Sequence, residues 1–197
     1  MFDLTPLEIE ALGLSLRVAL WSVAVSLPFG LAMAWLLARH EFFGKTLLNG
    51  IVHLPLVLPP VVVGYLLLVL FGRQGPLGAW LLATFGISLP FTWEGAALAA
   101  AVMAFPLMVR AMRLSIEAVD QSLETAARTL GASRGNVFVT ITLPLIMPGI
   151  LAGAVLAFAR SLGEFGATIT FVSNIPGETR TLPLALYSLI QTPGGEA

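Results

Sequence analysis

Long apolar stretches dominate the sequence, and they predict four membrane-spanning helices. The first stretch, Val18–Ala38, carries no charged side chain and lies within a span expected over residues 16–38. Three further spans are expected at about residues 47–71, 93–112 and 141–164. Because a helix needs roughly 20 apolar residues to cross a bilayer, the pattern predicts an all-α polytopic membrane protein.

Two segments between these spans are not expected to cross the membrane. Leu77–Leu89 is apolar, but the flanking Pro76 and Pro90 leave it too short for a span, which favours an interfacial or re-entrant helix. Residues 113–136 form a long polar segment between the third and fourth predicted spans. The whole chain, residues 1–197, is therefore expected to be one transmembrane domain with a structured loop.

Composition agrees with this assignment and narrows the chemistry. Hydrophobic residues make up 57% of the chain, charged residues only 11%, and the mean hydropathy is +0.93; soluble domains carry roughly 25% charged residues. The chain has no cysteine, no phosphate-binding loop and no metal-ligand spacing. We therefore expect no cofactor and no metal on this chain, and its net charge of −1 offers nothing to nucleic acid.

The distribution of basic residues predicts the orientation. If Leu77–Leu89 does not cross, the first loop and the long polar loop share one side of the membrane, while the opposite side carries only Arg73 and Arg180. Since cytoplasmic loops carry the excess of basic residues, the N-terminus is expected in the periplasm. The basic residues assigned to the cytoplasmic side are Arg39, Lys45, Arg110, Arg113, Arg128 and Arg134.

The chain ends at Gly194–Ala197 without a terminal anchor or a basic stop. Four spans that start outside also place this end outside. We therefore expect the sequence to be truncated before one more span.

The long polar loop contains the signals of a short helix. Asp120 can cap its N-terminus, and Gly131 can end it in left-handed geometry. Ala127 and Gly131 lie four residues apart on one face, next to Ala126. Such small residues allow close approach, so the loop is predicted to meet a soluble partner.

The pattern AA-x₃-G-x₉-I-x-LP in this loop resembles the "EAA" loop of binding-protein-dependent ABC importer permeases. The resemblance implies the type I permease helix bundle, with a cytoplasmic coupling helix that docks into a separate ATPase chain. The family's glutamate is Thr125 here, and an acid lies one place earlier at Glu124, so either could meet the ATPase. The implied coupling residues are Glu124, Thr125, Ala126, Ala127, Gly131, Ala132, Ser133, Ile141, Leu143 and Pro144.

Two longer segments, Leu54–Gly78 and Ser161–Glu196, are similar to molybdate permeases of that family. This similarity implies a homodimer in the bacterial inner membrane, two ATPase subunits that carry ATP and Mg²⁺, and a periplasmic oxyanion-binding protein. It also implies a transport subunit, not an enzyme, with a further membrane helix beyond this sequence. Tungstate and sulfate permeases are related, so the anion stays open between these oxyanions.

The second predicted span is rich in helix-breaking residues. Pro55, Pro59, Pro60 and Gly64 lie within it. Prolines free backbone carbonyls and kink helices, which membranes tolerate where neighbours or a cavity satisfy the freed groups. One interpretation is a hinged helix that lines a pore, and the other is a packing kink against neighbouring helices.

Charged residues late in the fourth predicted span form a second candidate group. Arg160 and Glu164 are four residues apart, with Ser161 between them, so the two charges can neutralise one another. They are interpreted either as part of the anion path or its gate, or as a structural pair near the outer interface. His53 has no acid nearby in sequence and is expected to be structural.

The competing functions are a membrane-embedded enzyme and an ATP-independent transporter. An enzyme would need paired acids or histidines on several spans, but the sequence offers one Arg/Glu pair and one histidine at membrane depth. A secondary transporter is typically built from inverted repeats, and none is visible.

Overall fold

The structure, a computed structural model, describes residues 5–191 and is helical through most of that range, without any strand. The chain end at Gly194–Ala197 and the expected last span lie outside the described residues. The helices are α1 (Pro6–Arg39), α2 (Lys45–Val57), α3 (Pro60–Phe71), α4 (Pro76–Phe85), α5 (Trp93–Glu117), α6 (Gln121–Thr129), α7 (Arg134–Val137), the π-helical turn η1 (Phe138–Thr142), α8 (Leu143–Leu162), α9 (Gly166–Val172) and α10 (Leu182–Gln191).

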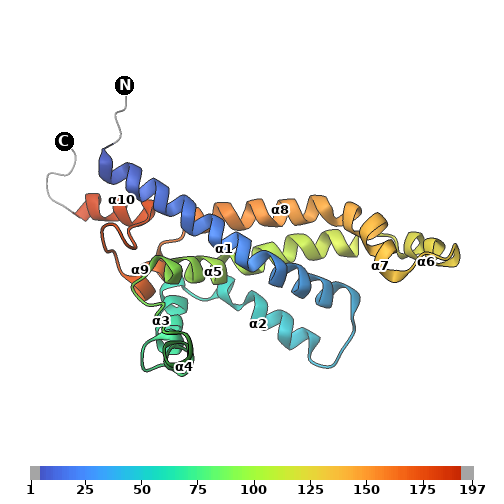
Figure 1. Cartoon of the computed structure of the whole chain (residues 1–197), viewed down its shortest axis with the longest axis horizontal. Coiled ribbons are helices and arrows are strands. Elements are labelled where there is room, and N and C mark those ends of the chain that lie inside the picture. Colours follow the sequence, from blue (N-terminus) through green and yellow to red (C-terminus); the bar gives the residue numbers. More distant parts are fainter. Residues whose placement is uncertain (1–4, 192–197) are drawn as a thin grey trace.

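Three long helices, α1, α5 and α8, run side by side along the long axis of the molecule (Figure 1). Helix α5 is their centre, because 61% of its most apolar stretch is buried against 28% for α1 and 33% for the helix that contains α8. Small residues permit the close packing: a Cβ added at Gly149 would collide with Ser115, and one at Gly153 would lie 3.0 Å from the Met108 carbonyl oxygen. Close backbone approach of this kind is typical of helix pairs in lipid.

The segment predicted as the second span, residues 47–71, is bent far more sharply than its prolines alone indicated. The segment forms two helices, α2 and α3, whose axes differ by 115°. Leu58 precedes Pro59 and adopts an extended conformation, as residues before proline commonly do. Pro60 then opens α3, where its missing N–H costs nothing. Pro55, in contrast, lies inside α2 without ending it.

Other boundaries differ less from the predicted ones. Helix α1 begins at Pro6, ahead of the predicted span, because Thr5 and Glu8 form a capping box. Helix α5 extends past residue 112 to Glu117. Residues 134–162 form one continuous helix although it contains Pro144 and Pro148, and the π turn η1 lies directly before Pro144.

The short helices lie at the two ends of the bundle (Figure 1). Helices α6 and α7 occupy one end, while α9 and α10 lie near the other, beside the start of α1. The Ser15 hydroxyl of α1 accepts a hydrogen bond from the Leu182 N–H at 2.7 Å, which ties α10 to α1. Helices α3 and α4 project away from the three long helices, and α4 is too short to span a membrane.

Candidate functional site

Residues 120–133, here called the α6 knob, form a compact projection at one end of the bundle (Figure 1). The Asp120 carboxylate caps α6 by accepting a hydrogen bond from the Ser122 N–H at 2.9 Å. The same backbone N–H, assisted by the Ser122 side chain, lowers the pKa of Asp120. Gly131 has φ +89°, and the Ala132 N–H bonds to the Ala127 carbonyl at 3.1 Å, which completes a Schellman ending. These cap residues agree with the sequence analysis.

One edge of the α6 knob carries exposed apolar side chains. No residue of α6 is buried, and Thr125 and Ala126 are exposed. Leu123 and Leu130 are 47% and 89% exposed, and they extend the small face around Ala127 at helical spacing. Sequence analysis missed these two leucines, although their i, i+7 spacing about Ala127 was a visible signal. An exposed apolar stripe on a polar loop marks a surface for a protein partner.

Glu124, next to Leu123 in sequence, faces the bundle. Its Oε1 atom lies 2.7 Å from Arg39 Nη2, at the end of α1. The same oxygen accepts a hydrogen bond from the Thr142 hydroxyl at 2.9 Å. Thr142 is buried in η1, just before α8. This three-residue clamp therefore joins the knob to two of the three long helices.

The clamp lies in a partly enclosed site. The Arg39 side chain is only 10% exposed, and its Nε atom has no hydrogen-bond partner among residues 5–191. Its guanidinium carbon lies 5.3 Å from the centre of the Trp35 ring, which in turn packs edge-on against Phe138 of η1. A buried guanidinium with these neighbours depends on Glu124 for charge neutralisation.

The remaining predicted coupling residues lie at the base of the knob. Ser133 caps α7 by accepting a hydrogen bond from the Asn136 N–H at 3.3 Å. Ile141 belongs to η1, while Leu143 and Pro144 form the first turn of α8. The Leu143 N–H reaches back to the Phe138 carbonyl, which produces the π turn. The predicted coupling residues are thus consecutive parts of one structural unit that leads from the knob into α8.

The proline-rich candidates divide between the two arms of the broken span. Pro55 lies on α2, whereas Pro59 and Pro60 make the bend. Gly64 is buried on α3 against α9, where an added Cβ would lie only 2.5 Å from the Ala167 carbonyl oxygen. Gly64 therefore serves packing, and the bend itself is the feature that suits a pore-lining hinge.

Arg160 and Glu164 form an ion pair with a separation of 2.7 Å. The Glu164 side chain is only 2% exposed, and its Oε1 accepts a hydrogen bond from the Ala167 N–H at 2.9 Å. Ser161 is also buried, with its hydroxyl oxygen 2.8 Å from that of Ser22 on α1. These contacts close the turn between α8 and α9 and favour the structural interpretation of the group.

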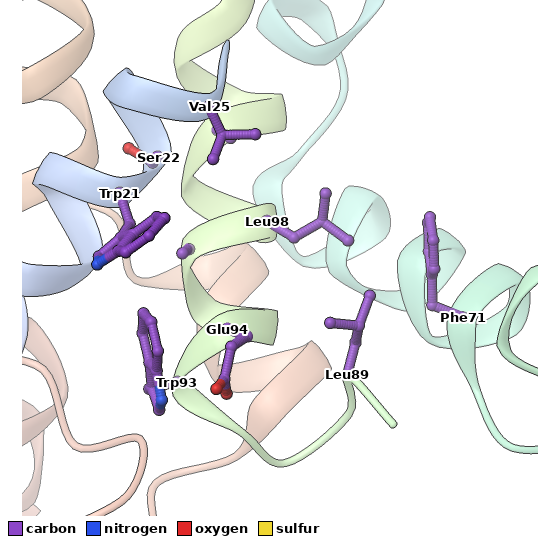
Figure 2. A pocket seen from close by; sticks show the side chains of 10 residues that line it. Trp21, Ser22, Val25, Phe71, Leu89, Trp93, Glu94 and Leu98 are labelled. Atoms are coloured by element: carbon purple, nitrogen blue, oxygen red, sulfur yellow. The ribbon is translucent and has the colours of Figure 1, made fainter. Parts of the chain in front are cut away.

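An apolar pocket of about 460 Å³ lies between α1, α3 and the first turns of α5 (Figure 2). The rings of Trp21 and Trp93 form one wall, and Phe71 and Leu89 lie opposite. Its charged lining group is the carboxylate of Glu94. A pocket of this chemistry would repel an oxyanion.

The bundle, the broken span and the capped knob are the features of an importer permease, and comparison with known sequences agrees. Residues 26–192 match the profile of the family described as the binding-protein-dependent transport system inner membrane component. The chain belongs to this family. It is a multi-pass protein of the inner membrane and a transport subunit, since members serve transport systems that depend on a binding protein.

Individual relatives show which members of the family the chain resembles. The chain is 68% identical to the molybdenum transport system permease protein ModB of Escherichia coli (strain K12), over 98% of this chain and 85% of that protein. It is 65% identical to the ModB protein of Haemophilus influenzae, over 96% and 83% of the two chains. The sulfate transport system permease protein CysT of Escherichia coli is 42% identical over 83% of this chain and 58% of that protein.

Among solved structures, the chain resembles a crystal structure of an amino acid ABC transporter with histidines, with a TM-score of 0.62. The match covers 94% of this chain and 78% of the other at 22% identity. This likeness concerns the fold alone.

Proposed function

We propose that this chain is the membrane-spanning subunit of an ATP-driven importer that carries molybdate across the bacterial inner membrane. The observation that carries the proposal is the 68% identity to a molybdenum permease along 98% of the chain. The identity to a sulfate permease is lower, 42%, which makes sulfate a second candidate substrate. Tungstate is the other second candidate, because its tetrahedral dianion closely resembles molybdate. Two copies of the chain are proposed to form the pore and to receive the anion from a periplasmic binding protein.

ATP and Mg²⁺ are proposed to bind only to partner ATPase subunits, which contact the α6 knob. The apolar stripe of Leu123, Ala127 and Leu130, in which both leucines are exposed, supports this docking, together with the exposed Thr125. Glu124 is already held by Arg39 and Thr142. Thr125 and the stripe are therefore proposed to meet the ATPase, while Glu124 passes the motion of the knob to α1 and α8.

The direction of transport follows from the proposed orientation. The knob end carries most of the basic residues and is placed in the cytoplasm, which leaves the N-terminus in the periplasm. Closure of the ATPase pair would move both knobs and open the paired bundles outward, and release of the nucleotide products would reverse the motion. Such coupling requires the knob to bind the two ATPase states with different free energies.

Transport by the full assembly in proteoliposomes tests the proposal. Uptake of radiolabelled molybdate should require ATP and the loaded binding protein, and unlabelled tungstate and sulfate should show which anions compete. Purification of the subunit from cells that also express its transport partners should yield an ATPase bound to it. Absence of both ATP-dependent uptake and an associated ATPase would overturn the proposal.

The docking role of the knob has its own test. Gly131 has φ +89° and open space around it, so Gly131→Trp both strains the Schellman ending and adds bulk to the docking face. Transport should be lost while membrane insertion is retained. Gly13→Trp is the matched control, because Gly13 also has open space but lies on α1 away from the knob. Normal transport by Gly131→Trp would refute the docking role.

A further inference from the structure

A polar pocket of about 350 Å³ lies at the contact between α2 and α5, toward the knob end of α5. Its lining is Asn49 and His53 from α2 together with Arg110, Arg113, Leu114 and Glu117 from α5. Arg113 Nε lies 2.7 Å from Glu117 Oε1, and Arg113 Nη1 donates to Asn49 Oδ1 at 3.1 Å. These contacts hold the Arg113 guanidinium across the contact between the two helices.

The free hydrogen-bond donors of this pocket are Arg110 and the side-chain amide of Asn49. Arg110 is exposed and has no ion-pair partner in the part of the chain that the structure describes, so its guanidinium charge is uncompensated. The side-chain oxygen of Asn49, Oδ1, accepts the hydrogen bond from Arg113, which leaves the side-chain NH₂ group of Asn49 free to donate. His53 uses its Nδ1–H in a 2.8 Å hydrogen bond to the backbone carbonyl oxygen of Asn49, so it offers the pocket no further donor as a neutral ring. With Glu117 offsetting Arg113, the pocket carries about one net positive charge.

The position of the pocket connects it to the broken span. Asn49 and His53 lie on α2, within three turns of the bend at Pro59 and Pro60. Arg110 lies seven residues before the end of α5, which is about 10 Å along the helix. Arg110 is exposed, and an uncompensated guanidinium must face water or an anion. The pocket therefore opens at the knob end of the hinged segment.

We propose that this pocket is a transient binding site for a tetrahedral oxyanion as it leaves the transport path. The proposal rests on the proposed function, because it supposes that an oxyanion passes through the bundle. Guanidinium groups match the geometry of such anions with paired donors. One net charge in an open pocket gives weak binding, which a path needs because the anion must also leave. The apolar pocket at the first turns of α5, with Glu94, has the opposite chemistry.

The absence of cysteine from the chain makes a direct test possible. Leu114 lines the pocket and is 60% exposed, so Leu114→Cys places a single thiol there without disturbing the core. The assembled importer in dodecyl maltoside is treated with an anionic or a cationic methanethiosulfonate reagent, and labelling of this chain is followed by mass. Millimolar molybdate, compared with chloride at equal ionic strength, should slow the anionic reagent about threefold or more.

Charge-removal variants identify the responsible group. In the Leu114→Cys background, Arg110→Gln should lower the ratio of anionic to cationic labelling rates about fivefold and abolish protection by molybdate. Arg110→Lys keeps the charge and should retain the rate ratio. Lys45→Gln is the matched control. Lys45 begins α2, near the pocket residue Asn49, but does not line the pocket, so this variant also removes one positive charge nearby. It should leave protection intact.

Three results would overturn the proposal. The first is that molybdate does not protect the thiol, and the second is that protection survives in Arg110→Gln. The third is that added short-chain phosphatidylglycerol protects while molybdate does not, which would identify a lipid phosphate as the occupant. Transport measurements separate this test from the proposed function. Molybdate uptake without protection refutes only the pocket. Protection with neither molybdate uptake nor an associated ATPase supports an oxyanion site and refutes the proposed function.

Discussion

The short helices at the two ends of the bundle are attached to it by different interactions. At one end, α6 buries none of its residues and is attached through the polar clamp of Arg39, Glu124 and Thr142. At the other end, α9 buries four of its seven residues, Ala167, Thr168, Phe171 and Val172, against α3 and α5. Separating α9 from these helices would expose its buried side chains to solvent. The free-energy cost is about 1.5–3 kcal/mol for each large apolar side chain.

The difference shows which end can move as a unit. A helix attached by one charged clamp can shift with its partner and keep its contacts, since the side chains are long. A helix fixed by buried apolar contacts moves only with the bundle. The two Arg–Glu pairs follow the same division: Arg39 and Glu124 are 85 residues apart, whereas Arg160 and Glu164 are separated by one helical turn.

The packed end should be the more sensitive to added volume. Gly64→Ala would place a methyl group against the Ala167 backbone on α9, which cannot yield as a flexible side chain would. We expect a loss of about 2–3 kcal/mol in the free energy of unfolding, measured by SDS titration in mixed micelles. Gly50→Ala on α2 is the control, because nothing lies within 4 Å of its added methyl group. Equal stability of the two variants would contradict the packing difference.

At the other end, loss of the clamp should reduce the coupling of transport to ATP hydrolysis. Glu124→Gln keeps the shape of the side chain but leaves the Arg39 charge without its partner, while the residues remain partly exposed. We expect molybdate transported per ATP hydrolysed to fall about tenfold with ATP hydrolysis retained. The measurement compares uptake and phosphate release in the same proteoliposomes.

Two variants control the coupling experiment. Glu41→Gln removes a carboxylate that is 88% exposed and pairs with Lys45, so it should leave transport per ATP unchanged. The exchange Arg39→Glu with Glu124→Arg restores opposite charges and should recover part of the coupling. Full coupling in Glu124→Gln would show that the clamp does not transmit motion.

The α6 knob was predictable because its signals are local. The Asp120 cap, the small residues and the left-handed Gly131 all lie within a dozen residues, and both caps act on the backbone of the same short helix. The spacing of the EAA-like pattern in addition predicted an ATPase as the partner of the knob. The Glu124–Arg39 contact was not predictable in the same way, because no local rule links a loop carboxylate to an arginine 85 residues earlier.

The broken span shows a second limit of sequence analysis. Hydropathy measures only whether residues 47–71 are apolar, and both a straight helix and two helices at 115° satisfy that condition. The prolines marked a kink, but the size of the bend depends on the packing of Gly64 and α3 against α9. Such packing involves residues about 100 positions apart, which one sequence does not relate.

The local ion pair should affect stability but not coupling. Arg160→Gln leaves the buried Glu164 carboxylate with the Ala167 N–H as its remaining contact. Because the Arg160 side chain is 27% exposed, we expect a modest loss of about 1 kcal/mol in the free energy of unfolding. Molybdate transported per ATP should equal that of the unmodified chain. A tenfold loss of coupling would assign this pair to the gate.

The smallest expected effect concerns the cap of the knob. The Ser122 N–H lowers the pKa of Asp120, so the ionised cap stabilises α6 above the ordinary aspartate pKa. That contribution should disappear as the pH falls through the lowered value in the folded chain. Hydrogen exchange at the first amides of α6, corrected for the intrinsic pH dependence, should show protection falling a few-fold over that range.

Substitutions separate the charge of this cap from its hydrogen bond. Asp120→Asn keeps an oxygen acceptor for the Ser122 N–H but cannot titrate, so its protection should not change with acid. Asp120→Ala lacks the acceptor and should show low protection at every pH. If the unmodified chain and Asp120→Asn respond alike to acid, α6 is held by the Glu124 clamp alone, and the knob moves as a body whose own helix needs no charged cap.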